Sequence, residues 1–273
     1  MGADDLHAAA DPGDDGSHDP VVDLVRRARR LWAHQAGVPV AAFSSTGLDP
    51  VIAPRSAIAP PGWVGIVVVD GQSLTTVPDA ATAASIREHL GGLDLAQVRD
   101  ETHWYGWVGA HQHLGPAHLS YGTGADVISR ALPGQVELLP PGAEELTALL
   151  RRTDPSEGAE SGMAEVTSRI AVAHGPTGVV AAAGYRRWAA GDESRVDELG
   201  DTGTGKAVAH LSVLTAAEVR GQHLAPLVAA AAAIEASRHG LLLQWRARPP
   251  ASRRVAARIG LRELGWQLSL DCR

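Results

Sequence analysis

The stretch from Ala207 to Gly240 constrains the fold of this chain more than any other. It reads as an apolar strand over Val208–Leu214, a connection over Thr215–Val219, and a long alanine-rich helix. Gly240 is placed as the residue that ends the helix in the left-handed conformation. A strand that turns into a helix aims the free N–H groups of the first helical turn past the end of the strand. Because Arg220 adds a charge at this turn, the stretch predicts an anion site, preferably for phosphate.

Composition narrows the classes of partner. The 273 residues carry a formal net charge of −7, which gives no general attraction to nucleic acid or to an anionic membrane. A single cysteine, Cys272, excludes an intrachain disulfide framework and a cysteine-based zinc site. No uninterrupted apolar run has the length of a membrane span, and no leader joins a basic start to an apolar core. We therefore expect a cytoplasmic protein.

Prolines, glycines and charges divide the chain into three parts. Residues 1–20 are acidic and rich in glycine and proline, which predicts a disordered tail. The segment 131–141 holds three prolines and a glycine, so we place a domain boundary there. The division gives a smaller N-terminal α/β domain over residues 21–135 and a second α/β domain over residues 136–273.

Local patterns place the elements of the first domain. Apolar residues at helical spacing predict a helix from Val21 to Ala36. Four arginines on its other face are interpreted as solvated, with a phosphate or nucleic-acid contact as the alternative. Asp70 and Gly71 predict a hairpin turn between two strands. Asp79 is the expected N-cap of a helix through Leu90.

The first domain also contains a cluster of histidines, at His103, His111, His113 and His118. His111 and His113 would share one face of a strand, as metal ligands can. No cysteine lies nearby, and no carboxylate stands at a ligand-like offset. Packing at a domain interface is therefore the favoured interpretation, and a metal site is the alternative.

The second domain has a mixed order of strands and helices. The strands before the long helix are expected over Arg169–Ala173, Val179–Trp188 and Val208–Leu214. After Gly240 come the strand Leu241–Trp245, a helix with Ser252 as its N-cap, and the final strand Glu263–Leu270. Because the long helix crosses between the strands on either side of it, those two strands should be parallel.

The segment Gly200–Lys206, GDTGTGK, has the spacing of a nucleotide-binding phosphate loop. The next residue is Ala207 rather than the serine or threonine that would hold magnesium, and no apolar strand precedes the segment. A strand is predicted after it, whereas a phosphate loop opens a helix. A flexible connection is the favoured interpretation, and a nucleotide- or metal-dependent enzyme is a minor alternative.

Two segments of the second domain carry a family resemblance. Arg220 to Ala225 read RGQHLA, and Ala251–Leu261 read ASRRVAARIGL. Together with the order of elements, residues 140–273 resemble the GNAT superfamily of acyl-CoA-dependent N-acyltransferases. Its signature is Q/R-x-x-G-x-G/A, which the chain matches at both ends. The resemblance implies a GNAT-like mixed sheet flanked by helices, in which the strand before the signature splays from the strand after the long helix.

The resemblance also implies acetyl-CoA, or another acyl-CoA, as co-substrate. The pantetheine arm would lie in the gap between the two splayed strands, and the pyrophosphate would rest on the turn that opens the long helix. The implied contacts are Val213, Leu214, Thr215, Arg220, Gly221, Gln222, His223, Leu224, Ala225 and Ser252. The acceptor would be an amine of a small molecule or peptide that attacks the thioester directly.

The chain departs from the family at positions that bear on the chemistry. His223 stands where the signature has glycine, so its side chain either crowds the pyrophosphate or donates a hydrogen bond to it. Pro249 and Ala256 stand where many members have an asparagine and a tyrosine, and the tyrosine would protonate the leaving thiolate. Either another donor serves or the thiolate leaves unaided. The alternative function is therefore a non-catalytic acyl-CoA-binding or regulatory module.

Two side chains are candidates for the base that takes the ammonium proton. They are Glu160, in a loop on the substrate side, and His210, on the strand beside the thioester; for each, an ordinary structural role is the alternative. Tyr185 and Trp188 are candidates for the acceptor pocket, with core packing as the alternative.

The first domain shows no GNAT signature over residues 20–135, so we expect no second active site there. Its order of elements is compatible with a degenerate second copy of the same fold. Its expected role is to wall the acceptor cleft or to form a homodimer contact.

Overall fold

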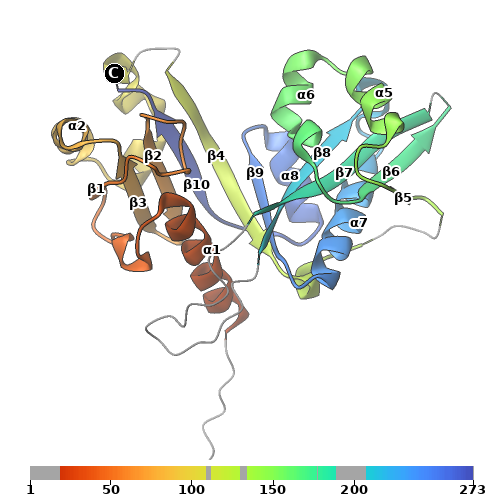
Figure 1. Ribbon diagram of the computed structural model, residues 1–273, viewed down its shortest axis with the longest axis horizontal. Coiled ribbons are helices and arrows are strands. Elements are labelled where there is room, and N and C mark those ends of the chain that lie inside the picture. The colour runs from red at the N-terminus through yellow and green to blue at the C-terminus, as the bar shows by residue number, and fades with distance from the viewer. Residues whose placement is uncertain (1–18, 109–111, 130–133, 177, 189–206, 273) are drawn as a thin grey trace, which may run out of the picture.

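Ten strands form one continuous sheet in the computed structural model, which describes residues 19–108, 112–129, 134–176, 178–188 and 207–272. Their order across the sheet is β1-β3-β2-β10-β4-β9-β8-β7-β6-β5 (Figure 1). The strands are β1 Pro50–Ile52, β2 Val64–Val69, β3 Gln72–Val77, β4 His113–Gly122, β5 Glu137–Leu139, β6 Ile170–Gly175, β7 Gly178–Trp188, β8 Val208–Thr215, β9 Leu242–Ala247 and β10 Arg262–Leu270.

The last strand, β10, lies among strands of the first predicted domain. It pairs antiparallel with β2 over Gly265–Leu270 and with β4 along its other edge. β4 in turn pairs antiparallel with β9 over His118–Gly122 and Leu243–Ala247. The predicted segments 21–135 and 136–273 therefore share one sheet rather than each having its own. The boundary near residue 136 stays a prediction as a division into domains.

Two lobes diverge from the line where β4 meets β9, and they give the molecule a V shape (Figure 1). We call β1, β3, β2, β10 and β4, with helices α1 to α4, the first lobe. The second lobe comprises β9, β8, β7, β6 and β5 with helices α5 to α8. The α-helices are α1 Pro20–Ala36, α2 Ala80–Leu90, α3 Leu95–Arg99, α4 Tyr105–Val108, α5 Glu144–Arg152, α6 Pro155–Ser161, α7 Leu224–Arg238 and α8 Pro250–Arg258.

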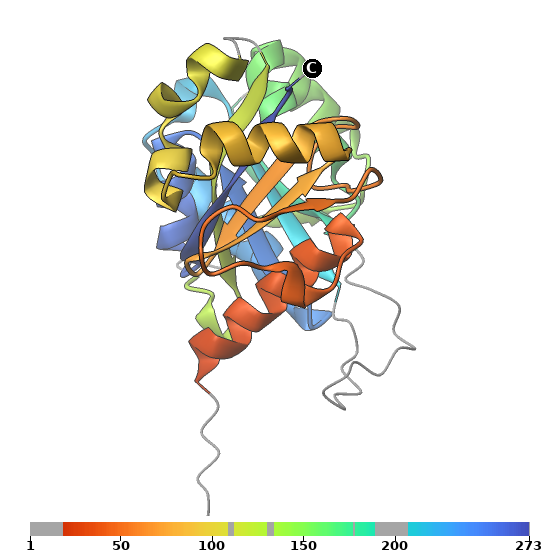
Figure 2. The same ribbon diagram turned by 90° about the vertical axis from the view of Figure 1, so that its left-hand side faces the viewer.

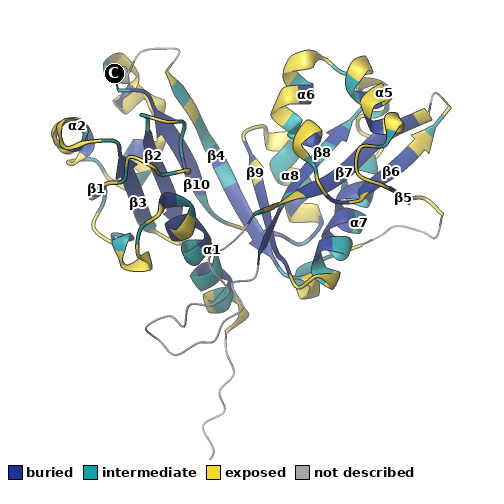
Figure 3. Ribbon diagram, viewed as in Figure 1, coloured by how far each residue is buried: buried dark blue, intermediate teal, exposed yellow. Residues whose placement is uncertain are grey.

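Helices cover both faces of the sheet. α1 packs against Val67 and Leu119 on one face of the first lobe, and α2 to α4 pack against Ile66 and Val68 on the other. Figure 2 shows this lobe from the side, with α1 in red. In the second lobe, α5 lies on the same face as α1, with α6 beside it, and α7 and α8 lie on the opposite face. Buried residues consequently run along the strands of both lobes (Figure 3).

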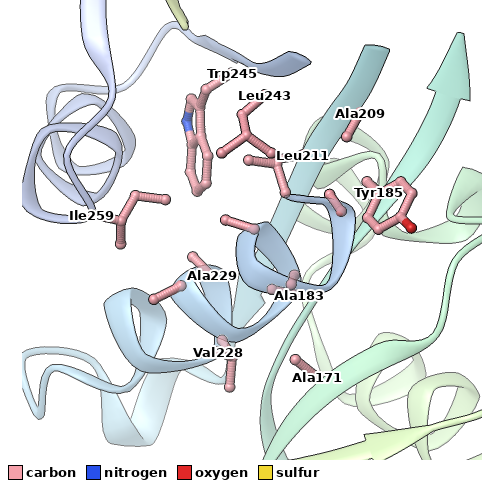
Figure 4. Close-up of a cluster of buried hydrophobic side chains, with 14 of the residues drawn as sticks. Ala171, Ala183, Tyr185, Ala209, Leu211, Val228, Ala229, Leu243, Trp245 and Ile259 are labelled. Carbon is pink, nitrogen blue, oxygen red and sulfur yellow. The ribbon is translucent and has the colours of Figure 1, made fainter. Parts of the chain in front are cut away.

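Helix α7 forms the centre of the second lobe. Its early turns are mostly alanine, which has the highest helix propensity and lets a helix approach a sheet closely. Val228 and Ala229 are fully buried in the same apolar cluster as Ala183 and Leu211 of the sheet (Figure 4). The helix ends as predicted, because Gly240 follows it with a φ of 67°.

The main local predictions for the first domain are confirmed. α1 matches the expected helix, and Asp79 caps α2 by accepting a hydrogen bond from the Thr82 N–H at 2.7 Å. Asp70 and Gly71 have φ angles of 51° and 72°, the values that a primed two-residue hairpin turn between β2 and β3 requires.

Two histidines of the predicted cluster, His113 and His118, lie beside different carboxylates. His118 Nδ1 lies 2.8 Å from Glu263 Oε1, whereas His113 Nε2 lies 4.0 Å from Glu101 Oε2. In the part of the chain that the structure describes, no three His, Cys, Asp or Glu side chains are grouped as metal ligands. Within the same ranges, no helix combines the length and the apolar character needed to cross a membrane. His111, the segment 200–206 and most of the predicted tail lie outside the described residues.

Candidate functional site

The site begins where β8 separates from β9. The two strands pair in parallel, as predicted, but only over Val208–His210 and Leu242–Gln244. β8 then continues to Thr215 along β7, and no pairing joins its residues 211–215 to β9. Their backbone groups on that side face a gap, which a strand edge leaves ready to pair with an extended ligand. The second lobe thus has the splayed pair and the order of elements of a GNAT-like mixed sheet.

The turn that opens α7 lies at the end of this gap. Gly221 and His223 have φ angles of 84° and 62°, and His223 occupies the N-cap position of α7. A positive φ explains the glycine of the family signature, because only glycine adopts it without strain. His223 adopts it at a cost, and its Nδ1 accepts a hydrogen bond from Arg258 Nη1 of α8 at 2.9 Å. The N–H groups of Leu224 and Ala225 begin the helix and have no intrahelical partner.

Arg220 is held beside the turn by an ion pair. Its guanidinium donates to both carboxylate oxygens of Glu157 in α6, at 3.0 and 2.6 Å. The hydrogen bond from Arg220 is the main reason that the pKa of Glu157 is lowered. The bond to Glu157 in turn raises the pKa of Arg220. A phosphate bound on this turn would therefore contact an Arg220 guanidinium that already forms an ion pair with Glu157.

A cavity of about 1390 Å³ runs from this turn to the space between the two lobes. All the predicted site residues except Gln222 line it: Glu160, His210, Val213, Leu214, Thr215, Arg220, Gly221, His223, Leu224, Ala225 and Ser252. Helix α1 and β4 line it from the first lobe. The structure therefore brings the predicted residues together, while their individual roles stay predictions.

His210 lies at the last paired position of β8, opposite Gln244 of β9. Its Nδ1–H donates to Gln244 Oε1, and its ring stacks on Trp188, with centroids 4.5 Å apart and planes inclined by 8°. Burial lowers the pKa of His210 from 6.5 to about 4, against the smaller opposing effect of the Gln244 hydrogen bond. The ring is therefore uncharged at neutral pH, with the lone pair on Nε2.

Glu160, the other candidate base, is engaged by a cation. Arg248 Nε donates to Glu160 Oε1 at 3.1 Å, and nearby Glu165 forms an ion pair with Arg186. Together with Glu157, three carboxylates on the α6 side of the cavity each hold an arginine. Of the two predicted bases, only His210 has its basic atom free of a cationic partner.

Helix α8 differs from the sequence-based prediction at its start. Ser252 is not the N-cap: Pro249 caps the helix, Pro250 begins it, and Ser252 lies within its first turn. The reason is that the fixed φ of proline suits the first helical position, and Ser252 Oγ accepts a hydrogen bond from Trp245 Nε1 at 3.0 Å instead. Ala256, where many GNAT members have tyrosine, is fully buried against α7 and the sheet.

Some residues of the cavity were not identified from the sequence. Of the two acceptor-pocket candidates, Trp188 lines the cavity. Tyr185 is instead packed in the core beside α7, which was the alternative given for it. Trp32 and Ile58 of the first lobe also line the cavity, as does Arg246. The helical pattern around Trp32 predicts core packing, and Arg246 read as part of a basic loop. No local signal distinguishes these three residues.

Comparisons with known proteins gave structural similarities only. No family model matches the chain, and no curated protein matches it in sequence. A GNAT-family protein from Novosphingobium aromaticivorans aligns over 58% of this chain at 18% identity, with a TM-score of 0.40. A GCN5-related N-acetyltransferase from Kribbella flavida aligns over 59% at 16% identity, also with a TM-score of 0.40. The chain spans 63% and 60% of the lengths of these two proteins.

An acetyltransferase of the GNAT family from Colwellia psychrerythraea aligns more fully. The alignment covers 93% of this chain and 97% of that protein, at 11% identity and a TM-score of 0.42. At these values the similarity gives neither residue correspondences nor a substrate. The site described above therefore rests on the geometry of this chain.

Proposed function

We propose that this chain is an N-acyltransferase that moves an acyl group, acetyl in the simplest case, from acyl-CoA to an amine. One observation carries the proposal: the gap between β8 and β9 joins a helix start at one end to His210 at the other. An extended thioester with an anionic end fits that shape. The strand edge would pair with its amide groups, and the helix start would receive its phosphates.

The cofactor would be held by backbone groups and by arginines. Residues 213–215 would pair with the pantetheine amides, and the Gly221–Ala225 turn would bind the pyrophosphate. Arg254 and Arg258 of α8 also line the cavity, so they would add charge around the phosphates beside Arg220. His223, whose Nδ1 accepts from Arg258, would donate its Nε2–H to a phosphate oxygen.

The acceptor amine would attack the thioester carbonyl directly, beside the point where β8 and β9 part. As the C–N bond forms, the nitrogen becomes positively charged and its proton becomes easier to remove. His210 Nε2 would take that proton, because Gln244 fixes the opposite ring nitrogen as the donor. Backbone N–H groups at the end of β8 would stabilise the oxyanion.

The CoA thiolate would then leave without a tyrosine at position 256. Ser252 is a hydroxyl of α8 that lines the cavity, and because its Oγ accepts from Trp245 it keeps its own proton to donate. Ser252 is therefore the candidate for donating a hydrogen bond to the leaving thiolate, which later takes its proton from solvent.

Calorimetric titration with acetyl-CoA tests the binding step, and thiol release with a library of amines tests the transfer. We expect saturable binding, and in the Arg220→Ala variant an affinity about tenfold lower, as losing a charged hydrogen bond to phosphate predicts. The stability of that variant should be close to that of the parent, because its ion pair with Glu157 is exposed. Absence of binding at millimolar acetyl-CoA would refute the proposal.

A non-catalytic acyl-CoA-binding module is the second candidate, favoured by the buried Ala256 and by Pro249. It predicts tight acetyl-CoA binding with no thiol release for any amine. Cytoplasmic residence and a homodimer contact through the first lobe stay predictions beside either function.

A further inference from the structure

The two walls of the cavity differ in charge. On the side of β1–β4, α1 and β10, every residue that lines the cavity is uncharged, and Trp32, Ile58, Pro60 and Leu114 make much of that wall apolar. Leu114 is 49% exposed on this wall, so an apolar group in the cavity could contact it. All the charged residues that line the cavity belong to the second lobe, including those of α8.

Arg246 lines the cavity without an ion pair to a carboxylate, as do Arg254 and Arg258 of α8 among the described residues, and of these three it lies on the strand that pairs with His210. Arg186, Arg220 and Arg248 each have a carboxylate partner. Over the described residues, Arg246 has no carboxylate within 4.0 Å, and its Nη1 donates only to the amide Oε1 of Gln267 at 3.3 Å. The protein atoms around the cavity are the main reason that the pKa of Arg246 is lowered, followed by the charge of Arg248, and the more distant carboxylate of Glu165 opposes this shift. Arg246 is thus a cation that is exposed to the cavity and has no carboxylate of the described residues in direct contact.

The position of Arg246 relates it to the reacting groups. It follows Gln244 by two residues on β9, so both side chains leave the same face of the sheet as His210. Two residues of strand advance roughly 7 Å, which is the scale of a small molecule. Gln267, its hydrogen-bond partner, also donates to the Ile58 backbone carbonyl at 2.6 Å, so Arg246 meets the apolar wall at this point.

We propose that the acceptor is a small amine that also carries a carboxylate and an apolar side chain, as an aliphatic α-amino acid does, and that Arg246 binds the carboxylate. The inference rests on the proposed acyl transfer. The amine would lie at His210 Nε2, the carboxylate would pair with Arg246, and the side chain would rest on the wall around Leu114. A guanidinium suits this role because it binds a carboxylate through two parallel hydrogen bonds.

Thiol release with matched acceptors tests the inference. We expect L-leucine to exceed leucinamide, which lacks the carboxylate, by at least roughly tenfold in kcat/KM. Arg246→Gln should bring this ratio close to one, and Arg246→Lys should retain part of it because the charge remains. Arg187→Gln is the matched control, because Arg187 is exposed on the opposite face of β7 and does not line the cavity. That variant should keep the ratio.

A binding measurement separates this inference from the proposed function. Acetyl-CoA binding is first measured by calorimetry on its own. The affinities of the two product analogues, N-acetyl-leucine and N-acetyl-leucinamide, are then compared by calorimetry in the presence of CoA, which requires no turnover. Preference for the carboxylate form, lost in Arg246→Gln, supports the inference even for a protein that releases no thiol. Equal binding of both forms, or a preference that Arg246→Gln leaves intact, overturns it. Failure to bind acetyl-CoA overturns the proposed function instead.

Discussion

The two lobes are built from similar elements, and each has a strand that parts from β9: β4 pairs with β9 only over His118–Gly122, and β8 only over Val208–His210. In the first lobe, β10 and β2 pair without interruption over Gly265–Leu270. In the second lobe, β8 and β9 pair over only three positions before they separate. A fully paired strand has no backbone groups left for a ligand, whereas a splayed strand has. The gap beside β8 also leads to the start of α7, which is why the cofactor is proposed there and the first lobe is proposed as a wall.

The lobes also differ in how they are completed. The second lobe draws all its strands from one stretch of sequence, apart from the contact of β9 with β4. The first lobe needs β10 from the far end of the chain. Its wall is uncharged, and the other wall supplies every charge in the cavity. In the proposed reaction, the first lobe would therefore contact the apolar part of the acceptor, and the second lobe would supply the charged and reacting groups.

The largest expected effect concerns the strand that closes the first lobe. An added Cβ at Gly265 would lie 1.7 Å from the Val68 carbonyl oxygen of β2. Gly265→Ala should therefore cost about 3 kcal/mol or more in the free energy of unfolding, measured in urea. Hydrogen exchange should show faster exchange in β2 and β4 than in β7. Gly92→Ala, where the added Cβ meets open space, is the control, and equal stability of the two variants would contradict the interleaved sheet.

The next effect concerns the chemistry assigned to the second lobe. His210→Gln should lower kcat by about 10²- to 10⁴-fold, the usual contribution of a general base, and leave acetyl-CoA affinity unchanged. His34→Gln makes the same change on an exposed residue of α1 in the first lobe and should leave kcat unaltered. Full activity of the His210 variant would remove that residue from the mechanism.

The pH dependence of stability gives a third test. The pKa of His210 is about 4 in the folded protein and 6.5 as its ordinary value. Between these values the unfolded chain binds more protons than the folded one, so stability falls as pH decreases from 6.5 toward 4. The loss from this residue totals roughly 3 kcal/mol at most. Urea unfolding of the parent and of His210→Gln should therefore show a smaller acid loss in the variant; identical losses would contradict a neutral, buried His210.

The smallest expected effect is on acetyl-CoA affinity, and it tests whether His223 binds or obstructs the pyrophosphate. His223→Gly removes a side chain from a residue with a φ of 62°, so the relief of strain offsets the added flexibility of glycine and stability should change by less than about 1 kcal/mol. We expect acetyl-CoA affinity to fall by roughly threefold, because a hydrogen-bond donor to phosphate is lost. An affinity that rises instead would show that the imidazole obstructs the pyrophosphate.

The amino-acid sequence by itself determined the elements and their order along the chain. The hairpin at Asp70 and Gly71, the cap at Asp79 and the long helix before Gly240 all follow from patterns within a few residues. So does the parallel relation of β8 and β9, because a helix crosses between them. The Arg220–Ala225 turn was noted through its resemblance to the GNAT signature, and its role as a phosphate site stays a prediction. Ser252 was assigned wrongly as a cap because Pro250 competes for the same helix start.

Only the tertiary structure decided which strands become neighbours in the sheet and which residues of the two lobes line the same cavity. The hydrogen bond from Gln267 to Ile58 joins residues far apart in sequence, and no local pattern encodes such a pairing. The same holds for the insertion of β10, for the arginines paired with carboxylates beside the cavity, and for the hydrogen bond from Arg246 to Gln267. Periodicity fixes which face a side chain takes, whereas partner choice depends on packing summed over the whole chain.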